Sequence, residues 1–466
     1  MRVARSIDLP RGTPPGITPP GSTPPANNPP DEGTSERSTP PLADAHRDYR
    51  GELSVFPGAE GFGSTTRAGR GGQVLRVTNL ADSGPGSFRA AVTASGPRTV
   101  VFEVGGIIRL KSQIRVREPF LTIAGQTAPS PGITLAGDVL RFETHDVLMQ
   151  HMRIRVGAGT SSTSTPPKVR DGLGVRTNDR GEPHTYNIYI DHCSISWAFD
   201  ENVSLWYSNV YDITIRNSII SEAIAYNRDK MISFGMIVGY GQRRVSVLRN
   251  LFAHNGDRNP KFTKDNSGLV VNNVIYNVGN AAITTGAPPP AAPTLLSVVG
   301  NVYIPGQDSR RSRQMVLAQN GHRDSRLFVD DNIGPFGNED PWSVVDNRVG
   351  RHIRADARPV DVAPLTVLPA VRAYGHVLAS AGARPRDRDA VDRRVVNDVR
   401  RGTGRLLERP SQVAALPSAR ATHRPLRPPS SLTADTDGDG YTDVEEWLHC
   451  MAAEVESGSR SLQCAR

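Results

Sequence analysis

The chain is poor in cysteine, in aromatic residues and in long apolar runs. Its 466 residues include only 3 cysteines, so a disulfide framework is excluded as the basis of the fold. Cys193 stands among alternating apolar residues, which indicates a buried thiol. Cys450 and Cys464 lie close together near the end and would pair if the protein is exported. No run of 18 apolar residues occurs, which excludes a membrane-spanning helix.

Two further absences bear on function. The first residues lack the apolar segment of a signal peptide, so we expect that the signal is missing from this start site or that the protein is exported by another route. No Cys-x-x-Cys, zinc or Ser–His–Asp constellation occurs. The net charge of +8 suits an anionic partner, but 6% aromatic residues and no recognisable motif argue against a nucleic-acid binder. An acidic polysaccharide is therefore the expected partner.

Glycine and proline are abundant instead, with 44 and 37 residues, and they mark the domain boundaries. Thr-Pro-Pro recurs at Thr13, Thr18 and Thr23, so residues 1–50 are predicted to be a disordered, proline-rich linker. The remaining boundaries follow from changes of pattern: a main domain over 51–384, an Arg/Pro-rich extension and linker over 385–430, and a small tail over 431–466.

Short β-branched runs dominate the main domain and repeat along it. Each repeat consists of two short strands that meet at a polar residue, and most repeats are about 23–33 residues apart, which suits one coil of a solenoid. The residues at the junctions are His151, His192, Asn217, Asn250, Asn273 and Asn301, which we expect to form an internal ladder. The pattern predicts an all-β fold, a right-handed single-stranded parallel β-helix. A β-propeller needs a longer period.

The tail contains a twelve-residue segment that fits a calcium-binding loop of the EF-hand type. Carboxylates recur at alternate positions, a glycine stands at the sharp turn, and a glutamate closes the loop. The expected calcium ligands are Asp435, Asp437, Asp439, the backbone carbonyl of Tyr441, Asp443 and Glu446. Because only one such loop is present, a dockerin-like or structural calcium module fits better than a calcium sensor.

Several stretches between about residues 56 and 404 resemble the bacterial pectate lyases, a family of the pectin-lyase-like parallel β-helix superfamily. The matching stretches are Phe56–Gly63, Val77–Ser87, Thr122–Pro129, Ile190–Trp197, Asn250–Asn255 and Asp257–Pro260. The calcium-loop tail also looks like one that is often appended to such lyases. The resemblance implies an extracellular, monomeric, calcium-dependent polysaccharide lyase that cleaves polygalacturonate by β-elimination.

The resemblance also implies roles for individual residues. Asp171 and Asp200 match the two calcium aspartates of the family, and Arg258 in Arg-Asn-Pro matches its proposed base. Lys230 resembles a substrate-binding lysine, although its surroundings match poorly. Arginine is an awkward base, because its pKa lies above about 12. Either nearby charges lower that pKa, or hydroxide takes the proton while Arg258 stabilises the enolate.

Two positions depart from the family pattern. Ser204 stands where a third calcium carboxylate is usual, and Thr263 where a second arginine is usual. Glu201 is the candidate replacement for the carboxylate, although its neighbour Asp200 would face the opposite way if both lay on one strand. Lys261 and Lys264 are candidates for the missing positive charge and for contact with substrate.

Each of these residues also has a purely structural interpretation. The aspartates would cap turns, Arg258 would pair with Asp257, and His192 and His254 are expected to be structural histidines. Two rival functions stay open. One is a galacturonan hydrolase of the same superfamily, which needs paired carboxylates. The other is a non-catalytic, carbohydrate-binding or adhesive surface protein, in keeping with the neutral Ser204 and Thr263.

Overall fold

The computed structural model describes residues 40–458, apart from 43, 159–162, 167–168, 179, 226–232, 287–291, 311–313, 320, 337–339, 348–349, 414–415 and 417–420. By its contacts the chain divides into residues 1–38 and 39–466, and all the described residues lie in the second unit. Residues 1–39 of the predicted linker lie outside the described residues, whereas its last part contains the strand β1 (His46–Asp48). The domain boundaries stay a prediction.

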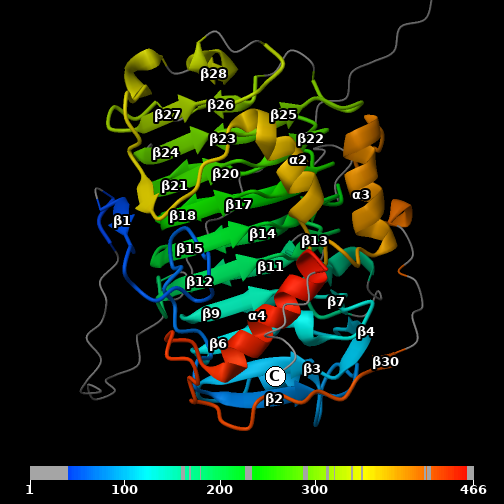
Figure 1. The fold of residues 1–466 in the computed structure, drawn as a ribbon. Coiled ribbons are helices and arrows are strands. Elements are labelled where there is room, and N and C mark those ends of the chain that lie inside the picture. Colours follow the sequence, from blue (N-terminus) through cyan, green and yellow to red (C-terminus); the bar gives the residue numbers. More distant parts are fainter. Residues whose placement is uncertain are drawn as a thin grey trace, which may run out of the picture. The chain divides into compact units, whose positions relative to one another are not determined.

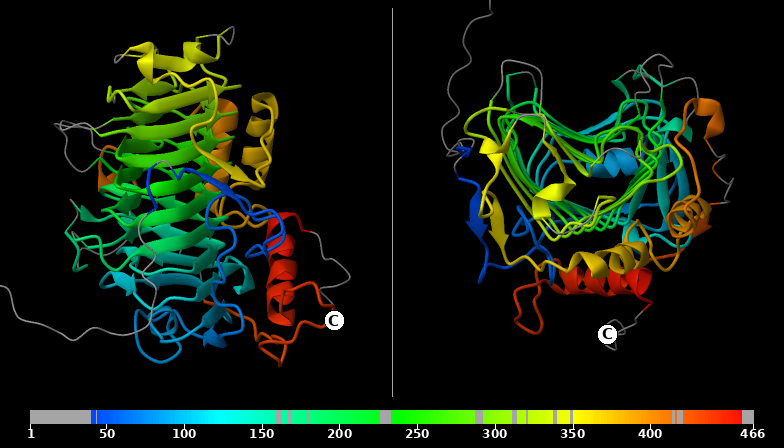
Figure 2. Two further views of the ribbon diagram at one scale, coloured as in Figure 1. Left: turned by 90° about the vertical axis from the view of Figure 1, so that its left-hand side faces the viewer. Right: turned by 90° about the horizontal axis from the view of Figure 1, so that it is seen from above.

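Three parallel sheets wind around one apolar core (Figures 1 and 2). Each strand pairs with its counterpart one coil later, so stacked strands share their hydrogen bonds along the axis. The strands are short and rich in Val, Ile and Leu, because every second side chain must fill the narrow interior. The predicted right-handed parallel β-helix is confirmed.

The sheet that carries the candidate site is called the site sheet here. It consists of β5 (Ile114–Val116), β8 (Leu140–Phe142), β11 (Leu173–Arg176), β14 (Glu201–Trp206), β17 (Phe234–Tyr240), β20 (Lys261–Lys264), β23 (Ile283–Thr285), β26 (Val316–Ala318) and β28 (Val345–Asn347).

The second sheet consists of β4 (Val104–Arg109), β7 (Ile133–Ala136), β10 (Met152–Arg155), β13 (Ser194–Ser196), β16 (Ile219–Ser221), β19 (Leu251–Ala253), β22 (Val274–Tyr276) and β25 (Val302–Ile304), with β30 (Thr422–His423) antiparallel at its edge. The third consists of β2 (Gln73–Val77), β3 (Arg98–Phe102), β6 (Leu121–Ala124), β9 (Val147–Gln150), β12 (Thr185–Asp191), β15 (Val210–Arg216), β18 (Arg243–Leu248), β21 (Asn266–Val271), β24 (Thr294–Val299) and β27 (Arg326–Asp330). A separate pair joins β1 (His46–Asp48) to β29 (Asp361–Ala363).

Four α-helices lie among the described residues: α1 (Phe88–Val92), α2 (Ala370–Ser380), α3 (Ala390–Arg401) and α4 (Asp443–Glu456). Short 3₁₀ turns occur at η1 (Gly125–Thr127), η2 (Val156–Ala158), η4 (Pro341–Val344), η5 (Arg351–Ile353) and η6 (Pro410–Gln412). Helices α2, α3 and α4 lie outside the coil (Figure 2). Among the described helices, none combines the length and apolar character that a membrane crossing requires.

The amide ladder exists, with one register error in the prediction. Asn250, Asn273 and Asn301 donate side-chain hydrogen bonds along the axis over 2.9–3.0 Å, and Asn332 accepts the last of them. Ser218 precedes Asn250 in this row, because its backbone N–H donates to the Asn250 side chain over 2.9 Å.

The earlier coils place the predicted junction residues one position away from the ladder. Asn217 has a left-handed backbone (φ 48°) and donates to Asp191 instead, over 3.2 Å. The rings of His151 and His192 stack on each other with centroids 5.4 Å apart. The expectation that these three residues belong to the ladder is wrong, because each of them is the left-handed residue before the ladder position, equivalent to Arg249 and Asn272 in the later coils.

Candidate active site

Three carboxylates of neighbouring coils meet on the outer side of the site sheet. Asp171 lies just before β11, Asp200 lies just before β14, and Glu201 is the first residue of β14. One oxygen of each carboxylate lies within 4.8 Å of the others. Parallel pairing of β11 with β14 brings the two strand starts together, because Leu173 pairs with Val203. The chain thereby gathers residues that are 30 positions apart in the sequence.

Burial makes this cluster electrostatically costly. Asp171 is 9% exposed and accepts a hydrogen bond of 2.7 Å from the Ser204 hydroxyl. Burial raises the pKa of Asp171 to about 7, the Ser204 hydrogen bond opposes that rise, and the charge of Asp200 adds to it. Burial likewise raises the pKa of Asp200. Two carboxylates that resist ionisation side by side form a site that a cation would stabilise.

The structure corrects the expectation about Glu201. Asp200 and Glu201 were expected to face opposite ways as neighbours on one strand, but Asp200 lies in the bend before β14, where strand alternation does not apply. Glu201 therefore joins the cluster, and its backbone N–H lies 3.4 Å from an Asp171 oxygen. Ser204, the neutral departure, contacts Asp171 directly.

Arg258 faces the cluster from a later coil. Its guanidinium pairs with the Glu201 carboxylate and lies 3.4 Å from the centroid of the Phe234 ring. A left-handed backbone at Arg258 (φ 61°) turns the side chain after the bridge between Phe234 and Asp257. Burial lowers the pKa of Arg258 to about 10, although Asp200 and Asp171 oppose the shift.

The two candidate lysines differ in outcome. Lys261 begins β20 on the site sheet, half-buried, and burial together with the charge of Arg258 lowers its pKa. Thr263, the second neutral departure, is buried two residues further on. Lys230 lies outside the described residues, so its predicted contact with substrate remains a prediction.

Sequence reasoning missed the cationic and aromatic neighbours of the cluster. Arg141 on β8 and Arg176 on β11 both act electrostatically on Asp171. Burial lowers the pKa of Arg141, and its guanidinium donates to the Gln113 side chain over 2.9 Å. Phe234 forms the surface under Arg258. Only the coil register could have revealed Arg141 and Phe234, because they lie 30 and 24 residues from Asp171 and Arg258 in the sequence.

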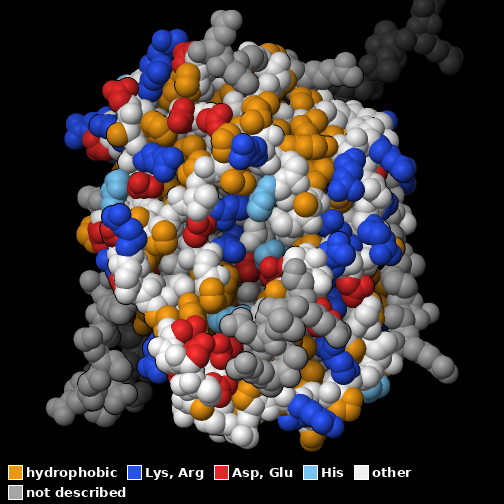
Figure 3. Space-filling model, viewed as in Figure 1, with side chains coloured by type: hydrophobic (Ala, Val, Ile, Leu, Met, Phe, Trp, Pro, Cys, Tyr) orange, Lys and Arg blue, Asp and Glu red, His pale blue; other side chains and the backbone are white. Residues whose placement is uncertain are grey.

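The C-terminal loop forms a second acidic cluster. One oxygen each of Asp435, Asp437 and Asp439 lies within 4.8 Å of the others, and partial burial and these charges raise the pKa of Glu446. Acidic side chains gather low on the face in Figure 3, where Figure 1 shows the loop before α4. Both carboxylate oxygens of Asp443 accept hydrogen bonds of 2.9 Å from Thr436.

The loop and its helix are fastened to the β-helix. The Tyr441 hydroxyl lies 2.8 Å from the Ser54 hydroxyl, and Arg70 pairs with Glu445 at 2.8 Å. Val444 and Leu448 of α4 pack in a cluster that includes Val101 and Ala124 of the coil. At the far end Glu456 lies 3.2 Å from His151 and 3.4 Å from His192.

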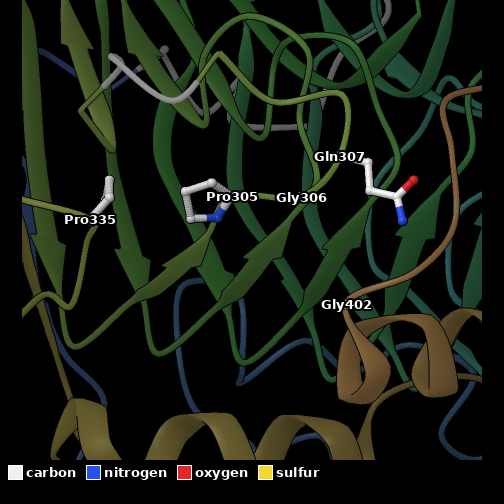
Figure 4. A pocket seen from close by; sticks show the side chains of 5 residues that line it. All are labelled: Pro305, Gly306, Gln307, Pro335 and Gly402. Atoms are coloured by element: carbon white, nitrogen blue, oxygen red, sulfur yellow. The ribbon is translucent and has the colours of Figure 1, made fainter.

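Another group that could hold a metal ion is formed by His151, His192 and Glu456. His192 and His254 are buried, Cys193 is a buried free thiol, and burial raises the pKa of Cys193 to about 12. Cys464 is outside the described residues, so its pairing with Cys450 stays a prediction. Among the described residues, the lining of a cavity of about 500 Å³ contains no ionisable side chain and consists of Pro305, Gly306, Gln307, Pro335 and Gly402 (Figure 4).

Comparison with known proteins identifies relatives at the level of sequence and fold. A search against models of protein families gave no match. A solved structure of a pectate lyase bound to a hexasaccharide has a similar fold, with a TM-score of 0.50 and 11% identity, over 72% of this chain and 98% of that one.

Curated sequences give the closer relationship. A probable pectate lyase C of Neosartorya fischeri is 34% identical over 403 residues, which covers 84% of this chain and 87% of the relative. A probable pectate lyase C of Aspergillus flavus is 33% identical over 405 residues, or 85% and 88% of the two chains. Both are fungal, whereas the motifs pointed to bacterial members. Identity of this degree over most of both chains shows that the chain belongs to the pectate lyase family.

Proposed function

We propose that the protein is a calcium-dependent lyase that cleaves polygalacturonate by β-elimination. One observation chiefly supports this: the Arg258 guanidinium, whose pKa is lowered, lies beside three carboxylates, and the atoms that these offer to a cation are all oxygens. An oxygen-only donor set suits a hard cation such as calcium. The raised pKa of Asp171 supports the same assignment, because burial and the charge of Asp200 outweigh the opposing charges of Arg141 and Arg176.

The reaction removes the proton at C5 of a galacturonate and expels the oxygen at C4. Bound at Asp171, Asp200 and Glu201, calcium supplies positive charge to the substrate carboxylate and to the enolate that develops from it. Arg258, in its neutral form, takes the C5 proton, and its lowered pKa increases the fraction available at alkaline pH. Lys261 lies three residues after Arg258, on β20, which pairs with β17, and it holds a neighbouring carboxylate of the polymer.

We infer that the C-terminal loop is a second calcium site, of EF-hand or dockerin type. Its donors are carboxylates of the tail together with one backbone carbonyl: Asp435, Asp437, Asp439, Tyr441, Asp443 and Glu446. Its contacts with the coil support a structural role. Because pectin is an extracellular polymer, the protein acts outside the cell, and it does so as a monomer, since one coil face holds the whole candidate site.

The activity is tested by incubating the protein with polygalacturonate in calcium or in a chelator. Ultraviolet absorbance of the conjugated, unsaturated product should grow in calcium alone, and its rate should rise about tenfold per pH unit until the pH approaches the Arg258 pKa of about 10. Arg258→Ala should lower the rate at least about 100-fold, whereas Arg372→Ala, at an exposed site on α2, should not.

Other outcomes would assign a different function. Reducing ends without the ultraviolet product would indicate the hydrolase. Binding of polygalacturonate with neither product would indicate the adhesive protein. Full activity of a folded Arg258→Ala variant would remove Arg258 from the reaction.

A further inference from the structure

An aromatic cluster lies on the site sheet, at the opposite end of its strands from the acidic cluster. Trp206 ends β14, Tyr207 follows it, and Tyr240 ends β17. The Trp206 ring centroid lies 5.5 Å from that of Tyr240 and 6.4 Å from that of Tyr207. Tyr240 is 42% exposed, one of few large apolar side chains so exposed among the described residues. These three residues are called the aromatic platform here.

The indole of Trp206 lies against the backbone of the sheet. A Cβ atom built on Gly239 of the adjacent strand β17 would be 2.6 Å from Trp206 Cε3 and 3.0 Å from Cζ3. Any side chain at Gly239 would therefore displace the indole. Since one side of the ring is against the sheet, its opposite side faces away from the sheet. This is the geometry of a flat surface on which another ring can stack.

The platform is continuous with the acidic cluster. Ser204, which donates to Asp171, lies two residues before Trp206, so both side chains face the same way and their Cα atoms are about 7 Å apart. Gly239 lies opposite Thr263, because the pairs on either side join Val238 to Phe262 and Tyr240 to Lys264. The two positions that lack the family's usual charge therefore adjoin the platform.

Cationic side chains flank the same surface. Arg176 pairs in register with Trp206, and its guanidinium lies 4.9 Å from the centroid of the Tyr207 ring. On the other side, Lys261 lies two strands from Ser204 in the same row of the sheet, because Ile237 of β17 pairs with both residues. An apolar ring face between positive charges matches a sugar acid, which has an apolar C–H face and a carboxylate.

We propose that the aromatic platform is a galacturonate-binding subsite, in which the C–H face of a sugar ring stacks on Trp206 while Arg176 pairs with its carboxylate. This inference rests on the proposed substrate of the acidic cluster. Stacking removes apolar area of both rings from water and places polarised C–H groups on the negative face of the indole. Stacking on Trp206 would thus hold one sugar ring beside Ser204 and Thr263, whose small neutral side chains leave room for it.

The test uses fluorescence and affinity in the Arg258→Ala background, so that binding is measured without turnover. Addition of polygalacturonate with calcium should change the tryptophan emission, and Trp206→Phe should remove that change while keeping a flat ring. Trp206→Ala should weaken binding about five- to tenfold. Trp342→Phe, at a buried tryptophan of the 3₁₀ turn η4, is the matched control and should retain the emission change.

Further variants distinguish loss of the subsite from misfolding of the protein. Tyr240→Ala removes an exposed ring and should weaken binding about two- to fivefold. In the active protein, Trp206→Ala should act mainly on KM. An unchanged emission response and affinity in folded Trp206 and Tyr240 variants would overturn the subsite. Loss of turnover in every assay, with tryptophan-dependent binding retained, would instead overturn the proposed reaction and leave the subsite standing.

Discussion

Asp171 is the residue at which folding and function oppose each other. Its carboxylate is buried beside Asp200 and, among the described side chains, accepts a hydrogen bond from Ser204. A group whose folded pKa is about 7 and whose ordinary pKa is 3.8 binds more protons in the folded state between these values. Its contribution to stability is therefore complete below about pH 4 and is lost as the pH rises through 7.

Asp171→Asn should consequently stabilise the protein in chelator at alkaline pH, by about 2–4 kcal/mol, while removing activity. In calcium the difference in stability between the variant and the wild type should become smaller or reverse, because the wild-type protein gains stability from the bound ion and the variant does not. Thermal unfolding in both conditions measures this. A variant that is less stable than wild type in chelator would contradict the burial argument.

Arg258 shows how a neighbour changes the chemistry of a residue. Burial lowers the tendency of the guanidinium to hold its proton, whereas Asp200 and Asp171 oppose that effect. The Phe234 ring lies under the guanidinium. The pairing with Glu201 explains why Glu201 belongs to the site although the family pattern places no carboxylate at that position. The roles of both residues remain proposals that the variants above test.

At the scale of elements, the loop before α4 does more than offer carboxylates. Gly438 and Gly440 adopt left-handed conformations (φ 76° and 97°), which bend the chain around the Asp435 side chain. Thr442 and Glu445 form a capping box at the start of α4, and Glu445 also pairs with Arg70 of the coil. Hydrogen bonds and an ion pair therefore connect the loop, the start of α4 and the coil.

Calcium should accordingly raise the thermal stability of the protein through this loop. Asp435→Asn should lower the Tm in calcium by a few degrees, about 2–4 °C for each kcal/mol lost, and should have little effect in chelator. Asp356→Asn, at an exposed carboxylate on a distant coil, is the control. Equal losses with and without calcium would indicate a structural role for Asp435 that is independent of the ion.

At the scale of the whole molecule, one continuous apolar core runs through the stacked coils. The helices α2 and α3 add a second cluster on the outside, and α4 adds a third over the first coils. By its contacts the chain divides between residues 38 and 39.

Removal of residues 1–38 should therefore leave the Tm and the activity unchanged. Removal of residues 431–466 should lower the Tm, because Val444 and Leu448 lose their contacts with the coil, at about 1.5–3 kcal/mol for each buried side chain. Differential scanning calorimetry of both truncations measures the difference. An equal loss in the two truncations would contradict the division of the chain between residues 38 and 39.

The repeat of β-branched runs, the amide ladder and the calcium-loop spacing were readable from the sequence, because each depends on near neighbours and fixed periods. The coil register was not, since Asn217 resembles the ladder asparagines in sequence but occupies the left-handed position before the ladder. The approach of Glu201 to Asp171, the Phe234 surface under Arg258 and the packing of Trp206 against Gly239 came from the tertiary structure alone. Sequence spacing determines that strands stack, whereas the turns between them decide which side chains meet.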